Sequence, residues 1–150
     1  MSYEVIVAGL APIALNPGNE KTRGSAIRQL LDYLETTHSD LVDARIAISL
    51  HSKDEESRTT AISMLSIDFL ESRDRRIGAV IARVVKDESA SIDLRIFAYI
   101  NLIDVSGRST SEYPSLGAFQ FPSDVDWNFV DQYVSAGQEK EEGHKGDGSN

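Results

Sequence analysis

Cysteine is absent from this chain of 150 residues, and its absence excludes several kinds of chemistry. Disulfides, thiolate nucleophiles and cysteine-ligated zinc sites all need that residue. A chain without cysteine is compatible with a reducing compartment. We therefore expect neither a disulfide framework nor cysteine-based catalysis.

Long apolar runs are also missing, since none approaches the ~20 residues that a membrane-spanning helix needs. The apolar residues 5–15 resemble the core of a signal peptide in part. However, Glu4 precedes them without a nearby Lys or Arg, and Pro12 interrupts them. The sequence predicts a cytoplasmic protein that does not enter a membrane.

Basic residues are scarce: Lys and Arg number 15 against 24 Asp and Glu, which gives a net charge of −9. Nucleic-acid binding depends on Lys and Arg that neutralise phosphates, so this balance argues against a DNA or RNA partner. We expect a protein partner instead, of a kind that the sequence does not identify.

What the sequence does contain is a pattern, Arg-x-x-Ala-x-x-x-Leu, that occurs three times. The copies are offset by 35 and then 37 residues, a period typical of paired-helix repeats. Spacings of three and four residues place Ala and Leu on one helix face, with Arg at its margin. A small Ala lets a neighbouring helix approach, and Leu fills the space beyond. The copies are Arg23/Ala26/Leu30, Arg58/Ala61/Leu65 and Arg95/Ala98/Leu102.

A second register supports the same period, because residues 4–15, 39–50 and 74–85 align at a constant offset of 35. Each of these segments ends in an aliphatic residue and is followed by a polar turn. Two registers with one period predict an all-α chain of alternating helices and turns, without a sheet.

The first of these segments is ambiguous when it is taken alone. Residues 3–7 favour a β-strand, because they are rich in branched and aromatic side chains. Alignment with the two clearer copies favours a helix over 3–15, with a kink or an early end at Pro12.

The remaining pattern predicts helices whose ends carry capping residues. Ser39 or Asp40, Asp54, Ser91 and either Ser123 or Asp124 are expected N-caps, and Gly107 is an expected helix stop. Residues 108–122 should form an ordered loop pinned by its aromatic side chains. The predicted helices span about 20–35, 39–50, 55–69, 75–86, 91–103 and 124–134.

The predicted domain covers residues 1–136. Its last helix should cap the stack, because the final repeat would otherwise expose its apolar face. Residues 137–150 contain no large apolar side chain and are expected to form a disordered tail.

These features resemble the HEAT-like (armadillo-type) helical repeat proteins, in particular small uncharacterised bacterial ones. The resemblance implies an α-α superhelix, or solenoid, of about three helix pairs with a C-terminal capping helix. It also implies a ladder of Asp and Arg that links successive repeats. Two departures are four extra residues between Asp87 and Arg95, and Asn19 in place of Asp. The ladder residues would be Arg23, Asp54, Arg58, Asp87 and Arg95.

One basic cluster stands out in this acidic chain. We expect it to form a face that binds an acidic protein partner. The alternative is a solvent-exposed helix face without a binding role. Arg76 and Arg83 are seven residues apart and so share a helix face. The cluster consists of Arg73, Arg75, Arg76, Arg83 and Lys86.

Two apolar regions are further candidates for contact. The N-terminal segment has little polar surface, which predicts homodimerisation or partner binding through Val5, Ile6 and Leu10. The C-terminal aromatics form either an exposed patch or a cluster that covers the last repeat, and the covering role is favoured. They are Phe119, Phe121, Trp127, Phe129 and Tyr133.

No catalytic or metal site is predicted. The carboxylates fit helix caps and solvent-facing positions rather than a paired acid and base in a cleft. The histidines His38, His51 and His144 lack ligand spacing, and no nucleophile elbow or phosphate-binding glycine loop occurs. We therefore expect no cofactor and no metal.

The leading functional prediction is a non-catalytic protein–protein interaction module, a scaffold or adaptor with a concave binding face. A narrower alternative is an immunity or antitoxin-type inhibitor whose acidic surface masks a basic toxin. The enzymatic alternative is a HEAT-like DNA glycosylase or chromophore-lyase subunit. A glycosylase would need a broader basic face than this chain provides, and DNA binding at low salt would reverse that ranking.

Overall fold

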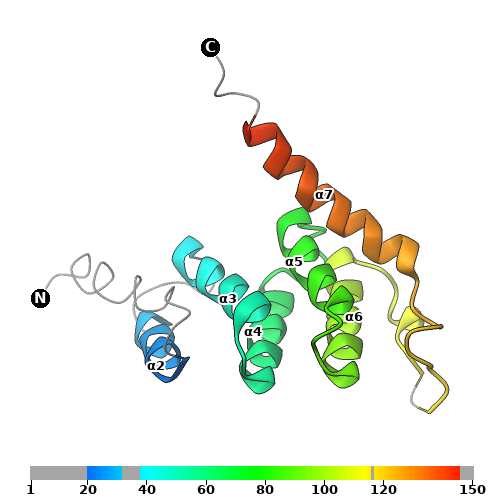
Figure 1. Ribbon diagram of the computed structural model, residues 1–150, viewed down its shortest axis with the longest axis horizontal. Helices are drawn as coiled ribbons and strands as arrows, with labels where there is room; N and C mark the ends of the chain where they lie inside the picture. The colour runs from blue at the N-terminus through cyan, green and yellow to red at the C-terminus, as the bar shows by residue number, and fades with distance from the viewer. Residues whose placement is uncertain (1–19, 32–37, 116, 146–150) are drawn as a thin grey trace, which may run out of the picture. The chain divides into compact units, whose positions relative to one another are not determined.

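The structure is a computed structural model that describes residues 20–31, 38–115 and 117–145. Within those ranges every regular element is helical, and strands are absent (Figure 1). The predicted all-α class is therefore confirmed. The elements are α2 (Glu20–Leu31), α3 (Ser39–His51), α4 (Glu55–Asp68), α5 (Arg75–Lys86), α6 (Ile92–Ser106), the 3-10 helix η1 (Thr110–Glu112) and α7 (Trp127–Lys145).

The contacts group the chain into two compact units, Met1–Asp68 and Phe69–Asn150. Helices α2 to α4 belong to the first unit and α5 to α7 to the second. The sequence predicts one domain over 1–136, whereas the contacts divide it after α4. The predicted helix over 3–15, with the candidate dimer residues Val5, Ile6 and Leu10, lies outside the described residues.

The first unit is centred on α3 and α4, which pack against each other. The side chains of Leu41 and Ala44 in α3 and of Ile62 and Leu65 in α4 are all buried. Burial of such a leucine contributes roughly 1.5–3 kcal/mol, less the entropy of ordering it. His38 precedes α3 and caps it, because its Nδ1 accepts a hydrogen bond from the backbone N–H of Asp40 at 3.2 Å.

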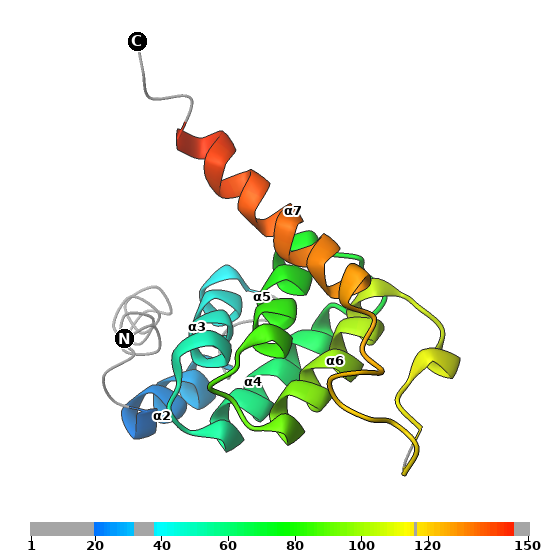
Figure 2. The ribbon, with the colours of Figure 1, turned by 45° about the vertical axis from the view of Figure 1, so that its right-hand side comes forward.

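The second unit is centred on α5, which packs against both α6 and α7 (Figure 2). Its apolar residues are buried almost all round, as expected for a helix covered on two sides. Asp74 caps its start by accepting a hydrogen bond from Ile77 N–H at 3.0 Å. The predicted N-cap Ser91 and stop Gly107 of α6 are confirmed, and Gly107 ends the helix in a left-handed conformation with φ of 74°. The helix runs to Ser106, three residues beyond its predicted end at Ile103.

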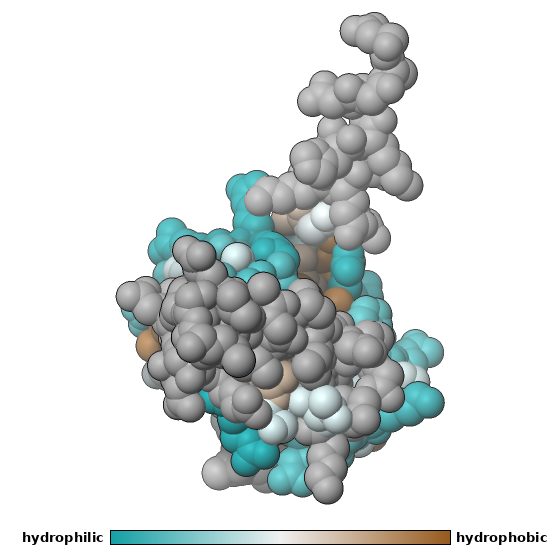
Figure 3. All heavy atoms as spheres, turned by 90° about the vertical axis from the view of Figure 1, so that its left-hand side faces the viewer, coloured by the Kyte–Doolittle hydropathy of each residue, from teal (hydrophilic) through white to brown (hydrophobic). Residues whose placement is uncertain are grey.

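The repeated alanines take the positions that the pattern predicts. Ala26, Ala61 and Ala98 are all buried, and so are Leu65 and Leu102. Polar side chains cover most of the described surface on the face shown in Figure 3. Among the described residues, three large hydrophobic side chains are exposed, namely Ile67, Leu70 and Ile92.

Helix α7 differs from its prediction at both ends. It begins at Trp127 rather than near Asp124, because the Asp126 carboxylate caps it by accepting a hydrogen bond from Phe129 N–H at 3.1 Å. It continues to Lys145, so residues 137–145 of the predicted tail are helical and extend beyond α5 (Figures 1 and 2). Gln, Glu and Lys are good helix formers, and the packed first half removes the cost of nucleation.

The segment 108–122 is ordered over its described residues, and aromatic contacts pin it as predicted. The Phe119 ring stacks on Tyr99 of α6 at 6.0 Å, and Phe121 meets Trp127 edge-on at 6.1 Å. Phe129 is buried, and its ring meets Tyr99 of α6 edge-on at 6.5 Å. No helix in the described part of the chain combines the length and the apolar character that crossing a bilayer requires.

Candidate functional site

Two of the five predicted partner-binding residues line a groove of about 870 Å³ in the second unit. Arg73 and Arg75, just before and at the start of α5, form one side of it. A polar face of α7 forms the other, because positions 128, 132 and 135 recur at helical spacing. We call this the α5–α7 groove, and its lining residues are Arg73, Arg75, Asn128, Asp131, Gln132, Tyr133, Ser135 and Ala136.

Backbone hydrogen bonds hold Arg73 in place. The backbone N–H of Glu71 donates to the Asp104 carbonyl and that of Arg73 to the Val105 carbonyl, each at 2.9 Å. Both Glu71 and Arg73 adopt left-handed conformations, with φ of 55° and 57°. Such a conformation costs about 1 kcal/mol or more for a residue other than glycine, so the turn persists because the end of α6 holds it.

Neither guanidinium on the groove has a protein counter-ion within the part of the chain that the structure describes. Their charge still affects Tyr133, whose ring lies against Gly78 of α5. Burial raises the pKa of the Tyr133 phenol, and the nearby Arg108, Arg73 and Arg75 oppose that shift. The groove is thus electropositive along the side formed by Arg73 and Arg75.

The other three members of the predicted basic cluster lie elsewhere. Lys86 pairs with Asp131 of α7 at 2.5 Å, an exposed pair that contributes about 0–1 kcal/mol. Arg76 and Arg83 both take part in other interactions, and Arg83 is half-buried. Of the basic cluster predicted from the sequence, only Arg73 and Arg75 therefore line this groove.

The repeated arginines form equivalent hydrogen bonds at the end of the preceding helix. Arg58 Nε donates to the Ser49 carbonyl of α3, and Arg95 Nε donates to the Val85 carbonyl of α5, each at 2.8 Å. They satisfy carbonyls that a helix end leaves without an internal partner. The side chain of Arg23 lies outside the described part of the structure.

The two aspartates of the predicted ladder occupy different positions. Asp54 precedes α4 and accepts hydrogen bonds from Ser57 N–H at 3.1 Å and Ser57 Oγ at 2.6 Å, which lower its pKa. Asp87 instead follows α5 as its C-cap. Ser91 is the counterpart of Asp54, since it caps α6 through Leu94 N–H at 3.2 Å. The extra residues before Arg95 lengthen the turn and separate Asp87 from the capping position.

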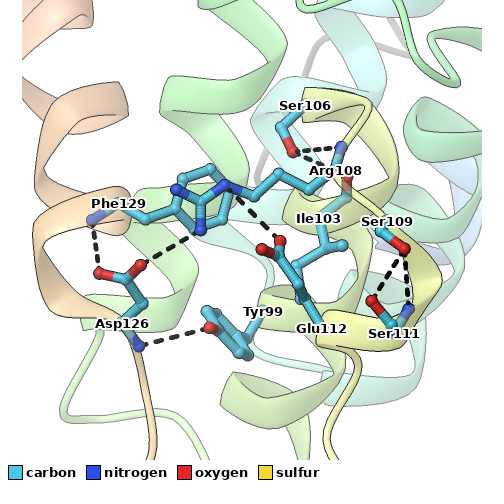
Figure 4. Close-up of polar contacts among 9 residues, drawn as sticks. All are labelled: Tyr99, Ile103, Ser106, Arg108, Ser109, Ser111, Glu112, Asp126 and Phe129. Atoms are coloured by element: carbon cyan, nitrogen blue, oxygen red, sulfur yellow. Dashed lines mark hydrogen bonds and ion pairs between the residues drawn. The ribbon is translucent and has the colours of Figure 1, made fainter.

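Two polar clusters were missed by sequence reasoning. Arg45 and Asp68 form an ion pair at 2.9 Å inside the first unit, with side chains only 4% and 10% exposed. In the second unit Arg108 lies 3.8 Å from the ring centre of Phe129 and donates to Asp126 at 3.2 Å (Figure 4). Glu112 is a third partner of Arg108, at 3.7 Å. This Arg108 cluster ties η1 to the start of α7. The hydrogen bond from the Phe129 backbone N–H and the one from Arg108 lower the pKa of Asp126.

Among the described residues, no group of three or more His, Asp or Glu side chains is placed to hold a metal ion. Comparisons with protein-family models, with curated proteins and with solved structures found no match to this chain.

Proposed function

We propose that the protein is a non-catalytic interaction module that binds an acidic segment of a partner protein in the α5–α7 groove. One observation carries this proposal: Arg73 and Arg75 place two guanidinium groups on a groove of about 870 Å³, and neither has a counter-ion among the residues that the structure describes. In a chain of net charge −9, such a pair of cations is a local exception.

The chemistry of the groove suits an extended acidic segment. Guanidinium groups bind carboxylates through two parallel hydrogen bonds, which gives both affinity and orientation. Asn128 and Gln132 on the α7 side offer amide donors and acceptors for the backbone of a bound chain. Complementary charge would also raise the association rate and make it depend on salt.

We also propose that α3–α4 and α5–α6 are two HEAT-like helix pairs of a superhelical array. The equivalent hydrogen bonds of Arg58 and Arg95 to the preceding helix end support this. The buried alanines at equivalent positions support it too.

A titration with a glutamate-rich peptide tests the binding proposal. The matched probe is the same peptide with every glutamate replaced by glutamine. We expect the acidic peptide to shift amide NMR signals of Arg73, Arg75 and the facing residues of α7, and the glutamine peptide not to. Equal binding of both peptides would contradict the proposal.

Charge reversal localises the interaction. The double variant Arg73→Glu and Arg75→Glu should abolish binding of the acidic peptide and leave the circular dichroism spectrum unchanged. Arg28→Glu, on an exposed position of α2, is the matched control and should keep binding intact. Affinity capture from the native host with the same variants then identifies the natural partner.

The overall charge of −9 favours a second candidate, an inhibitor that masks a basic toxin. That function predicts the opposite partner chemistry. Capture of a basic protein whose binding survives reversal of Arg73 and Arg75 would favour it over the interaction module described above.

A further inference from the structure

A second pocket, of about 490 Å³, lies in the same unit and shares no lining residue with the α5–α7 groove. It forms where the turn after α5 meets the segment that precedes α7. We propose that this pocket binds a small carboxylate that carries an apolar group. We call it the Arg95 pocket, and its lining residues are Lys86, Glu88, Arg95, Pro122 and Trp127.

Arg95 is the anchor, because its guanidinium is held on two sides. Its Nε donates to the Val85 carbonyl at 2.8 Å, and its Cζ lies 4.6 Å from the centre of the Phe121 ring. The two Nη groups keep their donors, since Arg95 has no carboxylate partner among the residues that the structure describes. A half-buried guanidinium in a fixed orientation is suited to bind a carboxylate through both Nη groups.

Trp127 and Pro122 supply an apolar wall beside this cation. The indole is also fixed, because its Nε1 donates to the Pro122 carbonyl at 3.1 Å and its ring meets Phe121 edge-on. With its one polar atom already bonded, the indole presents apolar surface. A rigid wall loses little conformational freedom when a ligand binds, which favours affinity.

The two remaining lining residues set the charge balance. Lys86 is already paired with Asp131, so its contribution to binding an anion is reduced. Glu88 is exposed and opposes an anionic ligand. Arg95 is therefore the main attraction for a carboxylate, and removal of Glu88 should strengthen binding.

The repeated arginine of the first unit shows why this role falls to Arg95. Arg58 makes the same Nε hydrogen bond to the preceding helix, but it is only 7% exposed and has further interactions. In the second unit the turn before α6 is longer, and Phe121 lies beside the guanidinium of Arg95. This guanidinium therefore lines a pocket. Arg95 thus donates its Nε hydrogen to the helix end and keeps its Nη groups for the ligand.

Trp127 makes the proposal directly measurable, because it is the single tryptophan of the chain. Phenylacetate is a suitable probe, and phenylacetamide is its neutral control of the same shape. We expect phenylacetate to change the fluorescence of Trp127 saturably, with a dissociation constant of about 1 mM. Phenylacetamide should bind about tenfold more weakly or not at all. Equal responses to the two probes, or no saturable response to phenylacetate, would overturn the proposal.

Variants separate this pocket from the groove. Arg95→Gln should weaken phenylacetate binding about tenfold, whereas Glu88→Gln should strengthen it about twofold at low salt. Arg73→Gln removes a cation from the groove alone and should leave phenylacetate binding unchanged. If Arg95→Gln fails to fold, Glu88→Gln decides, because unchanged or weaker binding in that variant contradicts the proposed charge balance.

Discussion

Helices α3 and α4 align with α5 and α6 when the first helix is shifted by 35 residues and the second by 37. Under this alignment Arg58 coincides with Arg95, and each donates its Nε hydrogen to a carbonyl at the end of the preceding helix. The caps coincide as well, since Asp54 corresponds to Ser91. The two pairs therefore share the polar contacts that define where their helices start and end.

Their interiors differ at one pair of positions. Arg45 and Asp68 form the buried ion pair of the first unit, and the corresponding residues of the second unit are Val80 and Val105, both buried. One helix pair thus holds two charges where the other holds two apolar side chains. The helix-end contacts therefore define the helix pair, whereas its interior accepts either an ion pair or two apolar side chains at these positions.

Breaking the ion pair should have the largest effect. Asp68→Val leaves Arg45 buried without this carboxylate and should lower the free energy of unfolding by about 3–5 kcal/mol. The double variant Arg45→Val and Asp68→Val reproduces the second unit and should recover most of that loss. Urea denaturation measures both, provided that the transition is cooperative. A double variant as unstable as Asp68→Val would show that the two interiors are not interchangeable.

Removal of the repeated arginine should rank next and should differ between the units. Arg58→Met deprives a buried carbonyl of a charged donor and should cost about 1.5–3 kcal/mol. Arg95→Met should cost less, about 0.5–1.5 kcal/mol, because water reaches this half-exposed site. Thermal unfolding of the two variants provides the comparison. Equal losses would mean that burial does not control the strength of this contact.

The packing of α7 on α5 gives a third test. Gly78 of α5 corresponds to Asp43 of α3, and a Cβ atom at Gly78 would clash with the Tyr133 ring. Gly78→Ala should therefore destabilise by about 1–2 kcal/mol despite a better helix propensity. Gly24→Ala in α2, where no atom lies within 4 Å of the added Cβ, should instead stabilise by about 0.5–1 kcal/mol. The midpoint of urea denaturation measures both variants. A higher midpoint for Gly78→Ala as well as for Gly24→Ala would contradict the close α5–α7 contact.

Local signals account for the elements that sequence analysis predicted well. The limits of α5 and the start and stop of α6 depend on Asp74, Ser91 and Gly107, whose capping chemistry acts within a few residues. The buried faces follow from helical spacing, as Ala61 and Ala98 illustrate. The predicted end of α7 near Val134 is wrong, because the helix continues to Lys145. Residues after 136 lack large apolar side chains, but their Gln, Glu and Lys favour a helix.

The sites depend on contacts between distant residues, and periodicity carries no information about these. Arg45 and Asp68 are 23 residues apart, and a surface ion pair would have the same sequence pattern. The members of the basic cluster are close together in the chain, yet only Arg73 and Arg75 among them line the α5–α7 groove. The sequence predicts a structural role for Arg95, which its Nε hydrogen bond fulfils. The apolar wall of the pocket beside it comes from Pro122 and Trp127, which follow α6 in the chain.

The smallest expected effect concerns a side-chain hydrogen bond in the second unit. The first unit has an apolar residue at the corresponding position and cannot form this bond. Asp104 of α6 accepts a hydrogen bond from the Tyr113 hydroxyl, and the corresponding residue of α4 is the exposed Ile67. The Asp104 carboxylate raises the pKa of Tyr113 from 10.0 to about 12. Because the folded-state pKa lies above the unfolded one, this bond stabilises the fold below pH 10.0, and its contribution disappears as pH rises to about 12.

The variant Tyr113→Phe isolates that contribution. Near neutral pH it should unfold at a lower urea concentration than the natural chain, and the gap should close as pH rises from 10.0 to about 12. Lysines and other tyrosines titrate in the same range, but they are common to both chains and cancel in the difference. The phenolate absorbance of the natural chain should also show one late step that the variant lacks. A constant gap across this range would mean that Tyr113 stabilises the loop through the packing of its ring, which Phe preserves only in part, rather than through Asp104.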